Sequence, residues 1–285
     1  MGVNKILITI ALLFACTFSG AAETIVKTGN DSVMYIRHPW YGVRVGYIGD
    51  SITDPRSYSS EITKYWKFLQ EWLHMTPYVY GVSGRQWNDV PNQAEKLKKE
   101  HGNDVDAILV FMGTNDFNHS VPLGEWYTEK KEQVMAAEGQ LKRPETRTHR
   151  TFCMTDSTFK GRINKGIRCL KALYPDKQIV LLTPLHRSTA VFSDKNVQPD
   201  ENYQNKCGLY IDAYVQAVKE AGNVWGVPVI DLNALSGLNP MAESQLSYFH
   251  NAAYDRLHPS TKGQMRMART LMYQLLTLPV HLGNH

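Results

Sequence analysis

Three polar residues in two widely separated motifs have the side chains that acyl-transfer chemistry needs. Ser51 closes the tripeptide Gly49-Asp50-Ser51 after an apolar run, and Asp255 stands three residues before His258. A serine hydroxyl becomes a nucleophile when a histidine takes its proton, and a carboxylate on the other ring nitrogen fixes the tautomer of that histidine. An Asp three residues before a His can fold back to make this contact. The two motifs therefore predict that Asp255 and His258 activate Ser51.

Each motif is weak when it is taken alone. A serine after a strand is also a good helix cap, and a surface Asp/His pair need have no catalytic duty. Gly84 and Asn115 add a third component, since each follows a predicted strand and can donate an N–H to a developing oxyanion. Gly for a positive φ and Asn-Asp for a local cap are the alternative interpretation of these turns. Together, the motifs favour a serine hydrolase.

The apolar patterns predict the elements that position these residues. Short apolar runs predict buried strands, and apolar residues at helical spacing predict helices between them. The expected strands cover residues 43–48, 77–82, 107–112, 178–183 and 227–231, and the expected helices cover 58–75, 94–101, 163–173, 210–221 and 259–276. Strands that alternate with helices indicate a parallel sheet covered on both faces. Ser51 would then lie between a strand and a helix start, and Pro259 would place His258 at an exposed N-cap.

Two insertions interrupt the alternation of strands and helices. Residues 117–157 are polar and charge-rich around a tip at Gly139, which predicts a β-hairpin arm, and residues 186–205 form a loop too long for a bare connection. Both start at the carboxyl ends of predicted strands, where open α/β sheets build their sites. A role in shaping the substrate site and a role as surface decoration or dimer contact both remain open for them.

The order of the motifs resembles the four sequence blocks of the SGNH (GDSL-like) hydrolase family. The resemblance runs from Val43 to Leu276 and rests on Gly49-Asp50-Ser51, Gly84, Gly113-Thr114-Asn115-Asp116 and Asp255-x-x-His258. It implies a flavodoxin-like three-layer α/β/α sandwich with a parallel five-stranded sheet, and ester hydrolysis that needs no metal or cofactor. Ser51 resembles the family's nucleophile, His258 its base and Asp255 its orienting acid. The backbone amides of Ser51 and Gly84 and the Asn115 side chain would form the oxyanion hole.

The second block departs from the family pattern, which leaves the substrate open. Val79 stands where many members have Asn, and Arg85-Gln86 stands where many have Asp-Thr. We expect an acylated carbohydrate, because aromatic and polar residues lie near the motifs in the sequence. The candidate substrate-binding residues are Asp50, Trp87, His186 and Arg187, with Phe117, His119, Trp126 and Tyr127 as further neighbours. A lysophospholipase or thioesterase, and a non-catalytic binding module on the same fold, are the alternatives.

The N-terminus predicts an exported protein with one globular domain. Residues 1–22 have a lysine, an apolar run and small residues before a cleavage point, as in a signal peptide, and residues 23–285 would be a single domain. An uncleaved anchor and lipidation of Cys16 are the alternatives. If the protein is not kept as an uncleaved anchor, lipidation would be its sole membrane contact. A formal charge of +4 on 285 residues does not indicate nucleic-acid binding. Formation of a homo-oligomer stays open.

Three cysteines remain after the leader is removed. Cys153, Cys169 and Cys207 are an odd number, so at least one thiol is unpaired in a monomer. Cys169 lies in a helical pattern and is expected in the core, whereas the spacing leaves a Cys153–Cys207 pair open. No C-x-x-C pair and no His-Glu-x-x-His motif occurs, so the sequence does not predict a zinc site. The lipase elbow Gly-x-Ser-x-Gly is also absent, which disfavours the α/β-hydrolase fold.

Overall fold

A five-stranded parallel sheet lies at the centre of the protein. The computed structural model describes residues 23–28, 31–36, 38–139 and 141–280. The sheet runs in the order β11-β8-β5-β3-β4, and every neighbouring pair is parallel. Its strands are β3 (Arg44–Gly49), β4 (Thr76–Val79), β5 (Ala107–Phe111), β8 (Gln178–Leu182) and β11 (Val229–Ile230). In chain order this is the 2-1-3-4-5 arrangement of flavodoxin-like folds, which confirms the predicted fold class.

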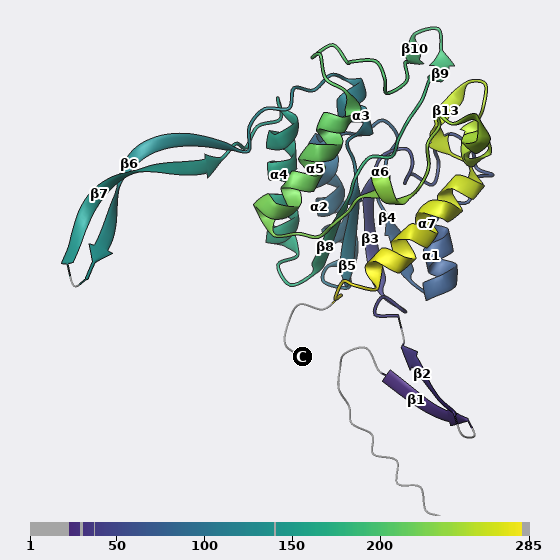
Figure 1. Cartoon of the computed structure of the whole chain (residues 1–285), viewed down its shortest axis with the longest axis horizontal. Helices are drawn as coiled ribbons and strands as arrows, with labels where there is room; N and C mark the ends of the chain where they lie inside the picture. The colour runs from purple at the N-terminus through teal and green to yellow at the C-terminus, as the bar shows by residue number, and fades with distance from the viewer. Residues whose placement is uncertain (1–22, 29–30, 37, 140, 281–285) are drawn as a thin grey trace, which may run out of the picture.

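Helices cover both faces of the sheet and complete three layers (Figure 1). Alternate residues of a strand point to opposite faces, so Val45 and Tyr47 of β3 join the core under α1 and α7, while Ile48 joins the core under α2, α4 and α5. The helices are α1 (Tyr65–Leu73), α2 (Val90–His101), α4 (Phe159–Leu173), α5 (Ile211–Trp225) and α7 (Thr261–Leu275). Shorter elements are α3 (Thr114–Asn118), α6 (Leu232–Leu235), η1 (Trp87–Asp89) and η2 (Glu243–Tyr248).

Two of the errors in the predicted helix starts concern the site. The helix expected from residue 58 begins only at Tyr65, because Tyr58 has φ +44°, outside helical geometry. The helix expected from Pro259 begins at Thr261, where the Ser260 side chain caps it by accepting from the Gly263 N–H. Pro259 ends the strand β13 (Asp255–Pro259) instead. His258 is therefore a strand residue rather than an N-cap.

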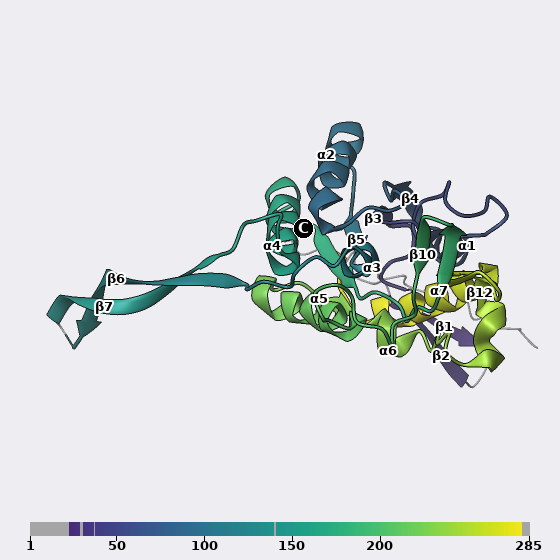
Figure 2. The same cartoon turned by 90° about the horizontal axis from the view of Figure 1, so that it is seen from above.

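The first insertion forms the predicted hairpin. Strands β6 (Tyr127–Glu138) and β7 (Leu141–Phe152) pair antiparallel along their full length. We call this ribbon the arm; Figures 1 and 2 show it extending from the side of α4 and α5, away from β9 and β10. Its base is fixed by Phe152, whose ring stacks on Trp225 at 4.4 Å, and by Asn164, whose amide donates to the Trp126 and Cys153 carbonyls.

The second insertion joins the strand that carries His258. Strands β9 (Ala190–Ser193) and β10 (Asn196–Gln198) form a small antiparallel sheet with β13 and β12 (Phe249–Asn251), in the order β10-β9-β13-β12. The pairing of Ala190 with Asp255 connects this sheet directly to the Asp-x-x-His motif. The long loop of the sequence is thus a structural support for His258.

The remaining features concern the termini and the cysteines. Near the N-terminus, β1 (Glu23–Thr28) and β2 (Asp31–Ile36) form a separate hairpin. The expected signal peptide and Cys16 lie outside the described residues. Within the described part of the chain, no helix has the length and apolar character needed to cross a bilayer. Cys153, Cys169 and Cys207 are all free thiols, and Cys169 is only half-buried.

Candidate active site

The sheet topology brings the sequence motifs to one place. The strand order reverses next to β3, and ligands of open α/β sheets bind at such a switch point, beyond the carboxyl ends of the strands. Ser51 follows β3, Gly84 follows β4, and Asn115 follows β5. Gly84 and Gly113 have φ values of +77° and +129°, which residues other than glycine adopt only with backbone strain.

Ser51 lies in a tight turn that is held by the residue before it. The backbone N–H groups of Thr53 and Asp54 donate to the Asp50 carbonyl at 3.1 and 2.9 Å, and the Ile52 N–H donates to the Asp50 carboxylate at 3.1 Å. The expected helix start after Ser51 is absent, since α1 begins at Tyr65. The turn presents Ser51 without help from a helix N-terminus.

His258 contacts Ser51 on one ring nitrogen and Asp255 on the other. The distance from His258 Nε2 to Ser51 Oγ is 2.8 Å, and the distances from Nδ1 to the two Asp255 oxygens are 2.9 and 3.1 Å. His258 is 6% exposed, so the expectation of an exposed N-cap is wrong. Burial lowers the pKa of His258, although the hydrogen bond to Asp255 opposes this. A neutral imidazole in this geometry can accept the serine proton.

Asp255 has a second histidine partner that the sequence motifs did not indicate. His250 Nδ1 lies 2.9 Å from Asp255 Oδ2, and the Leu257 and His258 N–H groups donate to Oδ1. Burial alone would raise the pKa of Asp255, but the bonds from His258 and His250 outweigh it and hold the pKa below its usual value. The carboxylate is therefore kept charged and fixed opposite His258.

Tyr58 and Lys64 form a further layer behind His258, and sequence reasoning missed both. The Tyr58 ring stacks on His258 with centroids 4.1 Å apart, and its hydroxyl donates to the Pro259 carbonyl at 3.2 Å. Lys64 Nζ lies 3.6 Å from the Tyr58 ring centroid and donates to the Ser51 carbonyl at 3.4 Å. Burial lowers the pKa of Lys64 to about 8. A buried cation thus adjoins the turn of Ser51 and lies behind the tyrosine that stacks on the base.

Asn115 is oriented by two acceptors. Its side-chain nitrogen donates to the Arg85 carbonyl at 3.0 Å and lies 3.4 Å from an Asp50 carboxylate oxygen. Burial raises the pKa of Asp50 to about 7. These contacts fix the amide plane of Asn115, which lines the same cleft as Ser51 and Gly84. A carbonyl oxygen at this point can meet polarised N–H donors, as an oxyanion requires.

The cleft at Ser51 has a volume of about 530 Å³, and more polar than apolar side chains line it. It is open to solvent between the turns after β3, β4 and β5 and the β9–β10 hairpin. Its lining residues are Ser51, Tyr58, Ser83, Gly84, Asn115, Asn118, His119, Phe192, Lys195, Asn196, Gln198, Leu257 and His258. No residue of the arm is among them, whereas β9 and β10 contribute four, counting Lys195 between them.

Comparison with known proteins identifies the family. The family model described as "GDSL-like Lipase/Acylhydrolase family" matches residues 47–266, which include every motif described above. The chain belongs to this family. Members are ester-hydrolysing serine hydrolases, so this GDSL-like hydrolase is a serine enzyme that acts on ester bonds. A comparison with curated protein sequences finds no match.

Solved structures share the fold of this GDSL-like hydrolase. A protein from Lactobacillus plantarum is 21% identical, with a TM-score of 0.61 over 82% of this chain and 96% of that one. A possible lipase from Chitinophaga pinensis is 22% identical, with a TM-score of 0.59 over 81% and 97%. An acetylxylan esterase from Geobacillus stearothermophilus is 19% identical, with a TM-score of 0.50 over 86% and 98%.

None of the four candidate substrate-binding residues lines the cleft of this GDSL-like hydrolase. Trp87 is fully buried in the core beside α4, so the structure contradicts a direct substrate contact for its side chain. Asp50 is 2% exposed, and its carboxylate accepts from the Ile52 N–H, so the structure contradicts a direct substrate contact for it as well. His186 bonds to Glu201 at 2.7 Å, which raises the pKa of His186. Among the aromatic and polar neighbours expected from the sequence, His119 alone lines the cleft; Phe117 and Trp126 are core residues.

Arg187 acts on the cleft through another residue. Its side chain is 1% exposed, which contradicts direct substrate contact, and Nη2 donates to Gln198 Oε1 at 2.8 Å. Gln198 Nε2 in turn donates to Asn196 Oδ1 at 3.1 Å, and both amides line the cleft. Burial lowers the pKa of Arg187 to about 10. Arg187 therefore orients the polar wall that the β9–β10 hairpin contributes.

In the described residues, no cluster of three or more His, Cys, Asp or Glu side chains is arranged to hold a metal ion. The groups at Ser51 that can do chemistry are its own hydroxyl, the two histidines, Asp255, Lys64 and the N–H donors.

Proposed function

We propose that this GDSL-like hydrolase cleaves esters through a Ser51–His258–Asp255 triad. The observation that carries the proposal is the continuous contact from Ser51 Oγ through both nitrogens of His258 to Asp255. Ser51 Oγ attacks the ester carbonyl while His258 Nε2 takes its proton, and His258 then gives the proton to the departing alcohol. Water attacks the acyl-enzyme by the same route and releases the carboxylic acid.

The oxyanion of each tetrahedral intermediate would lie among three donors. The backbone N–H groups of Ser51 and Gly84 and the Asn115 amide border the cleft at the carboxyl ends of three neighbouring strands. The turns fix the Ser51 and Gly84 N–H groups before substrate arrives. The Arg85 carbonyl holds one N–H of the Asn115 amide, and the other, which lies 3.4 Å from Asp50, would be donated to the oxyanion instead. Preorganised donors stabilise the transition state more than the substrate, which is how they accelerate the reaction.

We further propose that the substrate is a short acyl ester, such as an acetyl group, on a carbohydrate. The cleft lining includes four amide side chains, those of Asn115, Asn118, Asn196 and Gln198, and Arg187 holds Gln198 in place. Such side chains match the hydroxyl groups of a sugar, whereas a long acyl chain needs an extended apolar groove. Phe192 and Leu257 offer the cleft a small apolar surface, enough for a short acyl group.

Export outside the cytoplasm completes the proposal. The support is the N-terminal sequence alone, in which an apolar run follows Lys5 and ends in small residues. An acylated glycan outside the cytoplasm is a substrate that such a protein would meet.

A substrate panel tests the proposed specificity. Initial rates are measured with p-nitrophenyl acetate, butyrate and octanoate, and with an acetylated xylo-oligosaccharide. We expect kcat/KM to fall with chain length, and to be higher for the acetylated sugar than for a simple alkyl acetate. A kcat/KM that rises toward octanoate would contradict a carbohydrate esterase and favour the lipid-type alternative. If Ser51→Ala hydrolyses these esters as fast as the wild type, the triad is contradicted.

A further inference from the structure

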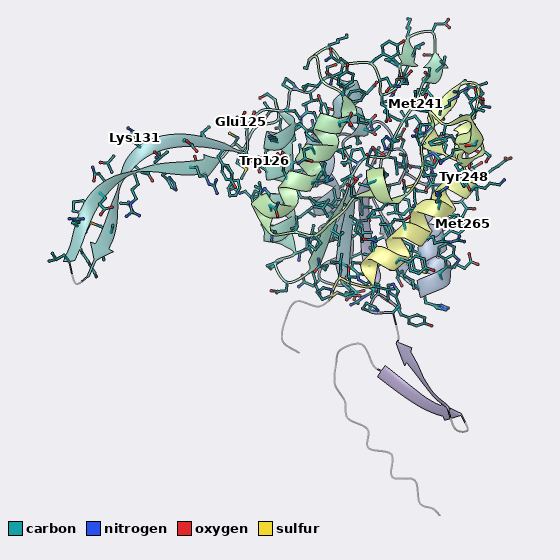
Figure 3. The ribbon with its side chains drawn as sticks, in the orientation of Figure 1. Glu125, Trp126, Lys131, Met241, Tyr248 and Met265 are labelled. Carbon is teal, nitrogen blue, oxygen red and sulfur yellow. The ribbon has the colours of Figure 1, made fainter. Side chains whose placement is uncertain are left out.

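A second concave surface lies on the outer face of α7, separate from the cleft at Ser51. It is a groove of about 670 Å³ between α7, α6 and η2. Tyr248 and Met265, which border it, are labelled in Figure 3. The lining of this groove and that of the catalytic cleft have no residue in common. The groove is therefore not an extension of the site already described.

Three cations line the groove in one stripe of α7. Lys262, Arg266 and Arg269 follow one another at intervals of four and three residues, so they share one face of the helix. The sequence of α7 contains no Asp or Glu, and in the described part of the chain none of the three cations has an ion-pair partner. Like charges at this spacing repel, and Lys262 lies near the positive end of the helix dipole. The three cations of α7 therefore repel one another on the face of the helix that lines the groove.

The central cation is held in a defined orientation. Arg266 Nε donates to the Ser236 carbonyl at 2.8 Å, and the guanidinium lies 5.1 Å from the Tyr248 ring centroid. Gly237, with φ +62°, leaves space for this guanidinium, since a Cβ there would overlap it. Such a fixed guanidinium can present its remaining N–H groups to an anion at little entropic cost.

Two tyrosines complete a surface suited to sugars as well as to charge. Tyr248 lies under Arg266, and Tyr273, which is 59% exposed, continues the stripe four residues after Arg269. Seven residues of helix separate Lys262 from Arg269, a distance of about 10 Å along the axis. One linear chain with carboxylates at intervals could contact both cations and pack sugar faces on the tyrosine rings.

We propose that the α7 groove binds an acidic polysaccharide, one that carries uronic acid carboxylates. This proposal rests on the proposed function, because the acidic polysaccharide would be a charged region of the polymer whose esters the enzyme cleaves. Carboxylates pair with Lys262, Arg266 and Arg269, and the sugar rings lie against Tyr248 and Tyr273. A bilayer surface is flat and would not enter this concave groove, which is why a polymer chain is favoured over anionic lipid.

Binding of polygalacturonate, measured by isothermal titration calorimetry, tests the proposal. The neutral probe is the same polymer with its carboxyl groups reduced to alcohols. The double variant Lys262→Gln/Arg269→Gln removes two cations of the groove. The control Lys67→Gln/Lys99→Gln removes two exposed cations from other helices and causes the same change in net charge.

We expect the groove variant to lose about tenfold or more in affinity and the control to lose less than about twofold. The reduced polymer should bind measurably to none of the three proteins, the wild type and the two double variants. Their kcat/KM values for p-nitrophenyl acetate should be the same. Equal loss in both variants, equal binding of the reduced polymer, or tighter binding of vesicles rich in phosphatidylglycerol would overturn the proposal. Binding is measured without ester hydrolysis. The calorimetric result therefore tests the groove even if the proposed esterase function is wrong.

Discussion

The catalytic cleft and the arm use polar residues in opposite ways. Around Ser51, charged and polar groups are buried and each is bonded to a particular neighbour, as Asp255 is to His258 and His250. Along the arm, the charges are exposed and contact near neighbours: Glu132 contacts His149 across the ribbon and pairs with Lys130 on its own strand. Buried hydrogen bonds are costly to leave unmade, whereas exposed ion pairs contribute little. Substitutions in the cleft should therefore affect chemistry strongly, and substitutions in the arm should not.

Asn115→Ala should show the largest effect among the residues that support Ser51. Loss of one oxyanion donor lowers kcat by about a hundredfold or more, because the transition-state charge is then less well stabilised. Steady-state kinetics with p-nitrophenyl acetate measure it. The matched control is Asn118→Ala, which removes another amide from the same cleft. An equal loss in both variants would contradict a special role for Asn115.

Lys64→Met should have a smaller effect that depends on pH. The groups that face His258 are Asp255, His250, Tyr58, Ser51 and Phe192, with Lys64 behind Tyr58; Lys64 and His250 lower the pKa of His258, and Asp255 raises it. Without the Lys64 cation, protonation of His258 becomes easier, so its pKa rises. The acidic limb of kcat/KM should then move to higher pH.

The measurement for Lys64 is a pH–rate profile of kcat/KM. We expect kcat/KM of Lys64→Met at about pH 5.5, relative to its plateau, to be about threefold lower than that of the wild type. At pH values above the acidic limb, kcat/KM should change little. Lys64→Arg keeps the charge and should restore the limb. A Met variant that loses activity equally at every pH would indicate a structural role for Lys64 alone.

Shortening the arm should have the smallest effect and tests the other side of the comparison. Lys130 and His149 are register partners, so an Asn-Gly turn can join them and replace residues 131–148. We expect kcat/KM for p-nitrophenyl acetate to change by less than about twofold, because the arm does not line the cleft. A loss of tenfold or more, with an unchanged unfolding temperature, would show that the arm contributes to catalysis.

The sequence predicted the part of the site that lies at strand ends. A short apolar strand such as β3 leaves few alternatives for the turn that follows, so Ser51, Gly84 and Asn115 could be placed together from the order of the strands. Asp255 and His258 could be paired because three residues separate them. These predictions depend on local spacing and on the rule that parallel strands end at one edge of the sheet.

The rest of the site depends on irregular segments that no periodicity describes. Tyr58 and Lys64 lie in the segment before α1, and His250 lies in the short strand β12. Their contacts with His258 and Asp255 arise from tertiary packing between distant parts of the chain. Trp87 was misplaced for a related reason: an aromatic residue next to a site motif has the same sequence appearance whether it faces the core or the cleft.

Labelling with a fluorophosphonate probe tests the central claim most directly. The probe bonds covalently to a serine hydroxyl that a neighbouring base has activated. We predict that the wild-type protein and Ser83→Ala, which alters another serine of the same cleft, are labelled at equal rates, and that Ser51→Ala is not labelled. Labelling that persists in folded Ser51→Ala would contradict the account, because a different residue would then be the nucleophile.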